Sequence, residues 1–170
     1  RTSHEINKIN VLDDDDYKKL INMEALNKFR SRALNPLKPN TRGTAENDDI
    51  YFQATEVRNI YYDKVPDIVN NYMEKINSLA GTNYKPFNYY GSKNAKKVIV
   101  AMGSVCETIK EVIDDLKEEI GLIEVHLYRP FSAKYFLQVL PKTVKNIAVL
   151  DRSKEPGSNC PLYLDVKDVI

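Results

Sequence analysis

Residue types that often carry chemistry are scarce in this sequence of 170 residues. It has no tryptophan, two cysteines (Cys106 and Cys160) and two histidines (His4 and His126). A structural zinc site takes about four Cys or His ligands, and an iron–sulfur cluster takes four cysteines. This chain by itself is therefore not expected to hold a metal ion or a cluster. Because the cysteines form no disulfide framework, we expect both thiols to stay reduced in a cytoplasmic protein.

A charge imbalance and a long apolar run are also missing. Lys and Arg number 25 and Asp and Glu number 24, so the net charge is +1. Such a balance predicts neither nucleic acid nor an anionic membrane as a partner. A transmembrane helix needs a tract of about 18 or more apolar residues, and the sequence has none. The chain opens without Met or a signal peptide and closes within a helical pattern, so we expect it to be excised from a longer protein.

The first 90 residues indicate a helical and irregular arm. The aspartates at 13–16 precede a loosely helical pattern, which favours a helix N-terminus over a metal site. Residues 35–53 carry prolines, asparagines and a glycine and are expected to be irregular. Apolar residues then recur at helical spacing up to residue 80, with Pro66 at a break or first turn and Gly81 just past the helix end.

Residues 91–170 alternate between strand and helix patterns. Strands are predicted over 97–102, 122–128 and 146–151, and helices over 105–119, over 132–140 and from Pro161 onward. This alternation predicts right-handed βαβ crossovers and a parallel sheet with flanking helices, so the fold class is α/β. We expect the arm (1–90) and this βαβ unit (91–170, cut at its last helix) to form one excised domain, with the arm packed on the core.

Ligands of open parallel sheets bind at the carboxyl ends of the strands, where three loops are expected to lie side by side. The first, Gly103-Ser104, has the outline of a phosphate-binding turn but lacks the further glycines of a dinucleotide site and the lysine of a P-loop. We interpret it as a structural corner. Cys106 follows in the first helical turn, where a lowered thiol pKa would suit a nucleophile. No general base accompanies it, so a small packing residue is favoured, and His126 is likewise interpreted as structural.

Two arginines follow the second and third predicted strands directly. Arg129 and Arg152 at neighbouring strand ends would be able to clamp a carboxylate, a phosphate or an acidic surface. The alternative is a salt bridge, with Asp151, Glu155 or a loop of another domain as the partner. Both interpretations stay open at the level of sequence.

Longer segments resemble one family. "RTSHEINKI", "RGTAENDDIYFQ", "VIVAMGSVCETIKEVID" and "AVLDRSKEPG" stand in an order and at a spacing similar to pyruvate:ferredoxin (flavodoxin) oxidoreductase, the pyruvate synthase family. The resemblance spans essentially the whole chain. Within the family the chain resembles core domain II, which is similar to the C-terminal domain of transketolases. Pyruvate:NADP oxidoreductase, a related branch, would contain the same domain.

The resemblance implies a large dimeric parent enzyme in the cytoplasm, or in an organelle of an anaerobic protist. Such enzymes oxidatively decarboxylate pyruvate to acetyl-CoA, with thiamine diphosphate, magnesium and iron–sulfur clusters as cofactors and coenzyme A as a substrate. Electrons pass to ferredoxin, flavodoxin or an NADP reductase domain. The resemblance places the cofactors in other domains, so we expect no catalytic, cofactor or metal residue in this inactive piece.

We therefore predict a structural module that contacts other domains of the parent chain and its dimer mate. An anion-binding module at the coenzyme A or substrate site is the alternative. The residues expected to make the contacts are Arg42, Thr44, Gly103, Ser104, Arg129, Arg152 and Lys154.

Overall fold

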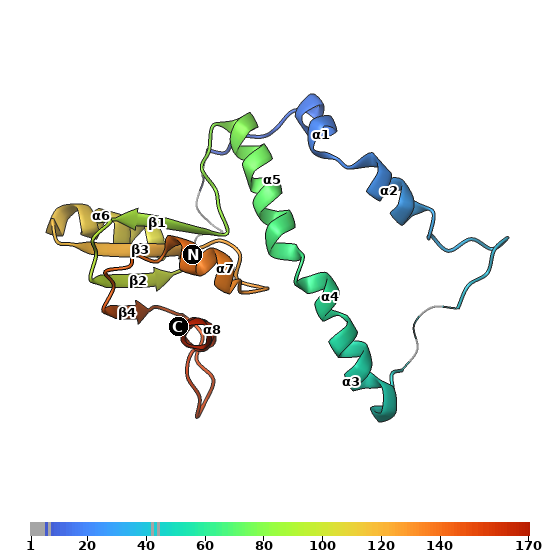
Figure 1. Ribbon diagram of the computed structural model, residues 1–170. Coiled ribbons are helices and arrows are strands. Elements are labelled where there is room, and N and C mark those ends of the chain that lie inside the picture. Colours follow the sequence, from blue (N-terminus) through green and yellow to red (C-terminus); the bar gives the residue numbers. More distant parts are fainter. Residues whose placement is uncertain (1–5, 7, 42, 44) are drawn as a thin grey trace.

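The computed structural model describes residues 6, 8–41, 43 and 45–170, and Figure 1 shows a sheet with its helices beside an extended helical arm. In chain order the elements are α1 (Asp14–Leu20), α2 (Met23–Arg30), α3 (Asp48–Val57), α4 (Asn59–Tyr62), α5 (Val65–Ala80), β1 (Phe87–Gly91), β2 (Lys97–Ala101), α6 (Val105–Leu116), β3 (Ile120–Val125), α7 (Ala133–Val139), β4 (Asn146–Val149) and α8 (Pro161–Val169). The predicted α/β class is confirmed.

The four strands form one sheet in the order β1-β3-β2-β4. β2 pairs in parallel with both β3 and β4, as the βαβ pattern predicts. β1 is an antiparallel edge strand on β3, and the sequence analysis missed it. Its sequence, FNYYG, has no β-branched residue. A half-buried antiparallel edge strand can form without the continuous Val/Ile run that marks a central parallel strand, so the pattern used to predict strands did not find it.

The sheet is covered on both faces. Val98 and Val100 of β2 point into a cluster with Phe136 of α7 and Leu162 of α8. Ala101, the next residue of the same strand, faces the opposite way, into a cluster with α6. Side chains on a strand alternate between faces, so a single strand fills two cores. This double burial fixes which residues of β2 and β3 face which helix.

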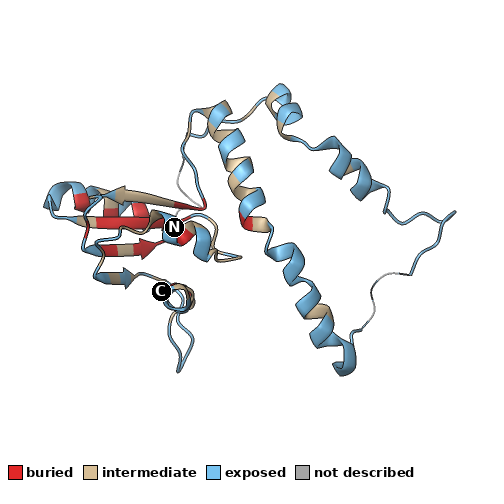
Figure 2. Ribbon diagram, viewed as in Figure 1, coloured by how far each residue is buried: buried red, intermediate tan, exposed pale blue. Residues whose placement is uncertain are grey.

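The N-terminal arm lacks a comparable core. None of the residues of α1, α2, α3 and α4 is buried, whereas the buried residues concentrate in the sheet unit (Figure 2). α5 lies closest to the sheet unit in sequence and carries the buried Pro66. Its Asp67 accepts hydrogen bonds from the Lys134 ammonium and the Tyr135 hydroxyl of α7, both at 2.7 Å. Residues 87–90, expected to belong to the arm, lie in β1 of the sheet, and the amides of His126 and Leu127 donate to the Pro86 carbonyl just before it. For the rest of residues 1–90, packing on the sheet unit stays a prediction.

Local signals in the arm behave as predicted. Asp13 caps α1 by accepting a hydrogen bond from the Asp16 amide at 2.8 Å, so the aspartate run serves as a helix N-terminus. Pro66 lies in the first turn of α5, and Gly81 ends that helix with a φ of +68°. A left-handed residue at this position is typical of a glycine cap. Among the described residues, no helix is both long and apolar enough to cross a membrane.

The contrast between arm and sheet unit predicts that two phenylalanines differ in their effect on stability. Phe136→Ala removes a fully buried ring and should lower the free energy of unfolding by about 3–5 kcal/mol. Phe52→Ala in α3, where the ring is 71% exposed, should change it by less than about 0.5 kcal/mol. Urea unfolding of the two variants measures both values. Equal losses would contradict the absence of a core in the arm.

Candidate functional site

The carboxyl ends of β2, β3 and β4 meet at one edge of the sheet, because the three strands run parallel. The loop after β2 lies between the other two, since β2 is the middle strand of the three. The sequence placed the candidate contact residues in these loops. Gly103, Ser104, Arg129, Arg152 and Lys154 all lie there, and Arg42 and Thr44 lie outside the described residues.

A cavity of about 320 Å³ opens between the loops that follow β2 and β4. Val105 and Leu150 are apolar, yet they are 41% and 45% exposed. Large exposed apolar side chains around a depression are typical of a protein contact. Three of the predicted contact residues line this cavity, whose full lining is Met102, Gly103, Ser104, Val105, Leu150, Asp151 and Arg152.

The backbone of each loop is fixed by a local interaction. Gly103 has a φ of +79°, which turns the chain from β2 into α6, and its carbonyl accepts a hydrogen bond from the Cys106 amide at 3.1 Å. Such a φ favours glycine. Asp151 accepts hydrogen bonds from the amides of Ser153 and of Leu162, both at 2.9 Å, and so ties the loop after β4 to the first turn of α8.

Asp151 and Arg152 thus have different roles although they are neighbours. The carboxylate of Asp151 accepts two backbone hydrogen bonds, one from the loop and one from α8. Arg152 is exposed, and among the described residues no acidic side chain forms an ion pair with it. The cavity therefore presents an apolar floor with one available guanidinium at its rim.

The clamp of two arginines, one of the two interpretations that the sequence left open, is not favoured by the structure. Arg129 and Arg152 follow β3 and β4, and these strands are separated by β2. The guanidinium of Arg129 forms an ion pair with Asp165 of α8 at 2.6 Å and lies over the Tyr128 ring, 4.1 Å from its centroid. The internal salt bridge foreseen as the alternative does exist, but its partner comes from α8 rather than from the adjacent loop.

An ion pair between α6 and β3 was not predicted from the sequence. Glu124 of β3 is 8% exposed, and one of its oxygens lies 2.9 Å from the Lys110 ammonium of α6. Lys110 also reaches Glu107 at 2.9 Å. The hydrogen bonds to Glu124 and then to Glu107 raise the pKa of Lys110. A glutamate inside an otherwise apolar strand, LIEV, was the signal, because buried carboxylates are rarely without a partner.

Cys106 lies beside this pair and is buried, as the packing interpretation predicts. Burial, and next the charge of Glu124, raise the pKa of its thiol. A nucleophilic cysteine requires a lowered pKa, so the surroundings oppose that role.

His126 directly follows β3, whereas the sequence pattern placed it within the strand. Its Nδ1 lies 2.9 Å from the carbonyl oxygen of Lys85, in the connection that precedes β1.

Among the cofactors that the family resemblance implies, the structure bears on the metal ion. The described residues contain no group of three or more His, Cys, Asp or Glu side chains able to hold a metal ion. The aspartate run lies in and before α1, where Asp15 pairs with Lys18 and Asp16 with Lys19. The sequence has two cysteines, fewer than a cluster needs.

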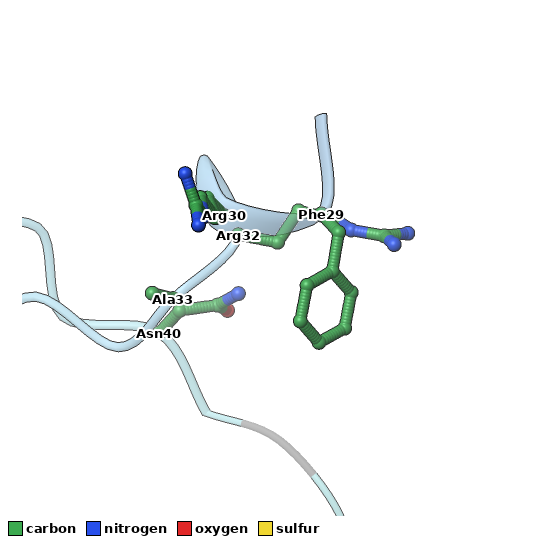
Figure 3. Close-up of a pocket in the computed structure, with 5 residues that line it drawn as sticks. All are labelled: Phe29, Arg30, Arg32, Ala33 and Asn40. Atoms are coloured by element: carbon green, nitrogen blue, oxygen red, sulfur yellow. The ribbon is translucent and has the colours of Figure 1, made fainter. Parts of the chain in front are cut away.

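A second depression, of about 600 Å³, lies in the arm after α2. Arginines line it, which is a pattern that suits an anion. Figure 3 shows, however, that the guanidinium groups of Arg30 and Arg32 point away from each other, and Arg32 lies over the Phe29 ring at 5.9 Å. The two groups do not converge on one ligand. We therefore assign the candidate site to the cavity at the carboxyl edge of the sheet.

Comparison with family models divides the chain in two. Residues 95–170 match the model of pyruvate:ferredoxin oxidoreductase core domain II. Residues 1–74 match the model of the pyruvate flavodoxin/ferredoxin oxidoreductase thiamine diphosphate-binding domain. The two matches leave a gap that runs from the second half of α5 to the residues before β2.

Curated relatives match along the whole chain. The chain is 56% identical over 171 residues to a pyruvate-flavodoxin oxidoreductase of Enterobacter agglomerans, covering 98% of this chain and 15% of the relative. It is 53% identical over 174 residues to a pyruvate:ferredoxin oxidoreductase of Moorella thermoacetica, covering 100% and 15%. It is 47% identical over 175 residues to a pyruvate dehydrogenase [NADP(+)] of Cryptosporidium parvum, covering 100% and 9%. The chain thus spans about a seventh or less of these relatives.

The Lys110–Glu124 pair predicts non-additive effects on stability. Lys110→Met leaves a buried carboxylate without its partner and should lower the free energy of unfolding by about 1–3 kcal/mol. Adding Glu124→Leu should restore most of the loss, because an apolar pair of similar size often replaces a buried ion pair at little cost.

The pH dependence of this loss follows from the pKa of Lys110, which is raised in the folded chain. The pair contributes its full stabilisation below the pKa of an unfolded lysine, about 10.4, and this contribution is lost as the pH rises through the pKa of the folded state. The loss should therefore be constant between about pH 6 and 9, and denaturant unfolding across that range measures it. A double variant no more stable than Lys110→Met would contradict the pairing.

The burial of Cys106 predicts that the two thiols react at different rates. Cys160 is half-buried at the start of α8, whereas Cys106 is 3% exposed and has a raised thiol pKa. At pH 8 a chromogenic disulfide reagent should modify one thiol per chain quickly and the second after unfolding in urea. The Cys160→Ser variant should lose the fast reaction. A fast reaction that persists in this variant would restore Cys106 as a reactive group.

Proposed function

The chain belongs to the pyruvate:ferredoxin oxidoreductase family, and from that premise we propose that it joins two domains of a larger pyruvate-oxidising enzyme. The parent enzyme oxidatively decarboxylates pyruvate to acetyl-CoA. It uses thiamine diphosphate, magnesium and iron–sulfur clusters, takes coenzyme A as a substrate and passes electrons to ferredoxin, flavodoxin or NADP. The names of the relatives and the tandem match of two family models support this proposal. The parent is cytoplasmic and dimeric in this proposal.

In the parent, this chain supplies contacts rather than chemistry. The observation that carries the proposal is the exposed apolar surface of the arm, whose α3 and α4 alone expose Ile50, Tyr51, Phe52, Val57, Ile60, Tyr61 and Tyr62. So many large apolar side chains exposed on two short helices are costly in water and indicate a site of association. Because residues 1–74 match the thiamine diphosphate-binding domain model, the surface is assigned to packing against the remainder of that domain.

The cavity at the carboxyl edge of the sheet provides a second contact, this time from the core domain II side. Gly103 and Ser104 form its wall, Arg152 stands at its rim, and the exposed Lys154 follows in the same loop. An apolar floor beside an unpaired guanidinium suits a neighbouring domain that brings an apolar side chain next to a carboxylate. Arg42 and Thr44 stay predicted contact residues of the arm. Arg129 is exposed and stays a predicted contact residue, although its guanidinium also pairs with Asp165.

Coenzyme A binding at this edge is not favoured by the geometry. That alternative rested on the pair of arginines together with the helix N-terminus after Gly103, and the strands that precede the two arginines are separated by β2. A single exposed arginine beside apolar side chains fits a protein surface better than a polyphosphate.

The interdomain role predicts a defect in assembly rather than in folding. In the full-length parent enzyme, Arg152→Ala should lower the fraction of assembled dimer and the pyruvate-dependent reduction of a viologen dye by about tenfold, because it removes a charge that pairs across the contact. Sedimentation velocity and dye reduction measure the two effects. The unfolding midpoint of the 170-residue chain should not change. Lys167→Ala, on the exposed side of α8, is the matched control and should leave both readouts at the wild-type level.

Two results separate the parts of this proposal. A wild-type parent that does not reduce the dye with pyruvate and coenzyme A would overturn the proposed activity. A parent that is active and assembles equally well with Arg152→Ala would overturn the role of the cavity alone.

A further inference from the structure

The opposite edge of the sheet, where β2, β3 and β4 begin, is rich in lysine before β2 and β4, whereas Glu118 and Glu119 precede β3. The segments 92–97 and 141–146 contain five lysines and no acidic residue, although the whole chain is nearly neutral. We call these residues the lysine edge: Lys93, Lys96, Lys97, Lys142 and Lys145. All five are exposed.

The lysine edge is held in place by backbone contacts. The Lys96 carbonyl accepts hydrogen bonds from the amides of Lys145 and Asn146, at 2.8 and 3.0 Å. The hydroxyl of Thr143 donates to the Ala95 carbonyl at 2.9 Å. Lys97 and Asn146 also stand opposite each other as the first residues of β2 and β4. Two segments almost fifty residues apart in sequence thus carry their charges on one ordered surface.

The charge of the lysine edge is little compensated within the chain. Glu118 approaches Lys97, with 3.9 Å between the ammonium and a carboxylate oxygen, and both side chains are exposed. A pair of that kind contributes little. Within the part of the chain that the structure describes, Lys93, Lys96, Lys142 and Lys145 form no ion pair. Like charges on a fixed surface repel one another, and a complementary partner removes that cost.

We infer that the lysine edge binds an acidic segment of a protein partner. This interaction is separate from the contacts proposed above, because it uses the end of the sheet opposite to the cavity. The composition of the two segments favours a protein over other anions. They have no aromatic side chain on which a base would stack, and no arginine for bidentate phosphate binding. Ala95 is buried and Val144 is half-buried, so no apolar side chain is free to enter a membrane.

Charge-reversal variants of the full 170-residue chain test this inference. The probe is a fluorescent oligoglutamate peptide, and its binding is measured by anisotropy at low and at physiological salt. Lys96→Glu with Lys145→Glu should weaken binding by about tenfold or more, because both charges lie at the centre of the lysine edge. Binding by the wild-type chain should weaken as salt rises. The matched control reverses the same number of charges on the arm, with Lys28→Glu and Lys38→Glu, and should bind as the wild type does.

Each result decides the inference. Selective loss of binding in the Lys96/Lys145 variant, with an unchanged unfolding midpoint, supports it. Equal loss in both double variants would show a response to net charge alone and overturn it. Stronger binding of a short inorganic polyphosphate than of the peptide, lost in the same variant, would also overturn it, because the surface would then be a phosphate site.

Discussion

The burial of β2 and β3 on both faces is the constraint on which the rest of the structure depends. Val98 and Val100 fill one core while Ala101 fills the other, so a shift of one residue would exchange the two sets of side chains. The register of the parallel strands is thereby fixed, and with it the identity of the residues at each strand end. Gly103 and Arg152 lie at one edge, and Lys97 and Lys145 at the other, because β2 and β4 pair in parallel.

The two ends of the sheet differ in the side chains that they expose. At the carboxyl end the loop carboxylate, Asp151, is used internally and leaves an apolar cavity with one cation. At the amino end, the segments that lead into β2 and β4 carry five lysines and no acid, whereas Glu118 and Glu119 precede β3. Between them, the Lys110–Glu124 pair places a charge inside the α6 face, where it is satisfied by two carboxylates rather than by a ligand. This arrangement suits a unit that holds neighbours in position and leaves chemistry to them.

The sequence predicted the parts of the fold that follow from local pattern. Strands with continuous apolar runs and helices with capping signals were placed to within a few residues, as at β2, at α6 and at Gly81. β1 was missed because an antiparallel edge strand has no such run. The arginine clamp failed for a different reason. Strand order is a property of the assembled sheet, and nothing in the sequence stated that β2 would lie between β3 and β4. The pairing of Glu124 with Lys110 was likewise a tertiary contact.

The arm shows why the fold of this chain is tied to a larger surface. Helices of four to ten residues, such as α4 and α3, are marginal in water on their own, and most of their stability comes from packing. In the arm that packing surface is present, since its tyrosines and isoleucines are exposed, but the described chain offers no partner for it. α5 differs, because Asp67 is held by Lys134 and Tyr135, which also keep the pKa of this carboxyl below its usual value. α5, in which the first family match ends, therefore contacts the sheet unit through an exposed group of side chains and the buried Pro66. If α3 and α4 pack on the remainder of the thiamine diphosphate-binding domain, this contact contributes to the orientation of core domain II relative to it, and the larger part of the interface comes from the exposed apolar side chains.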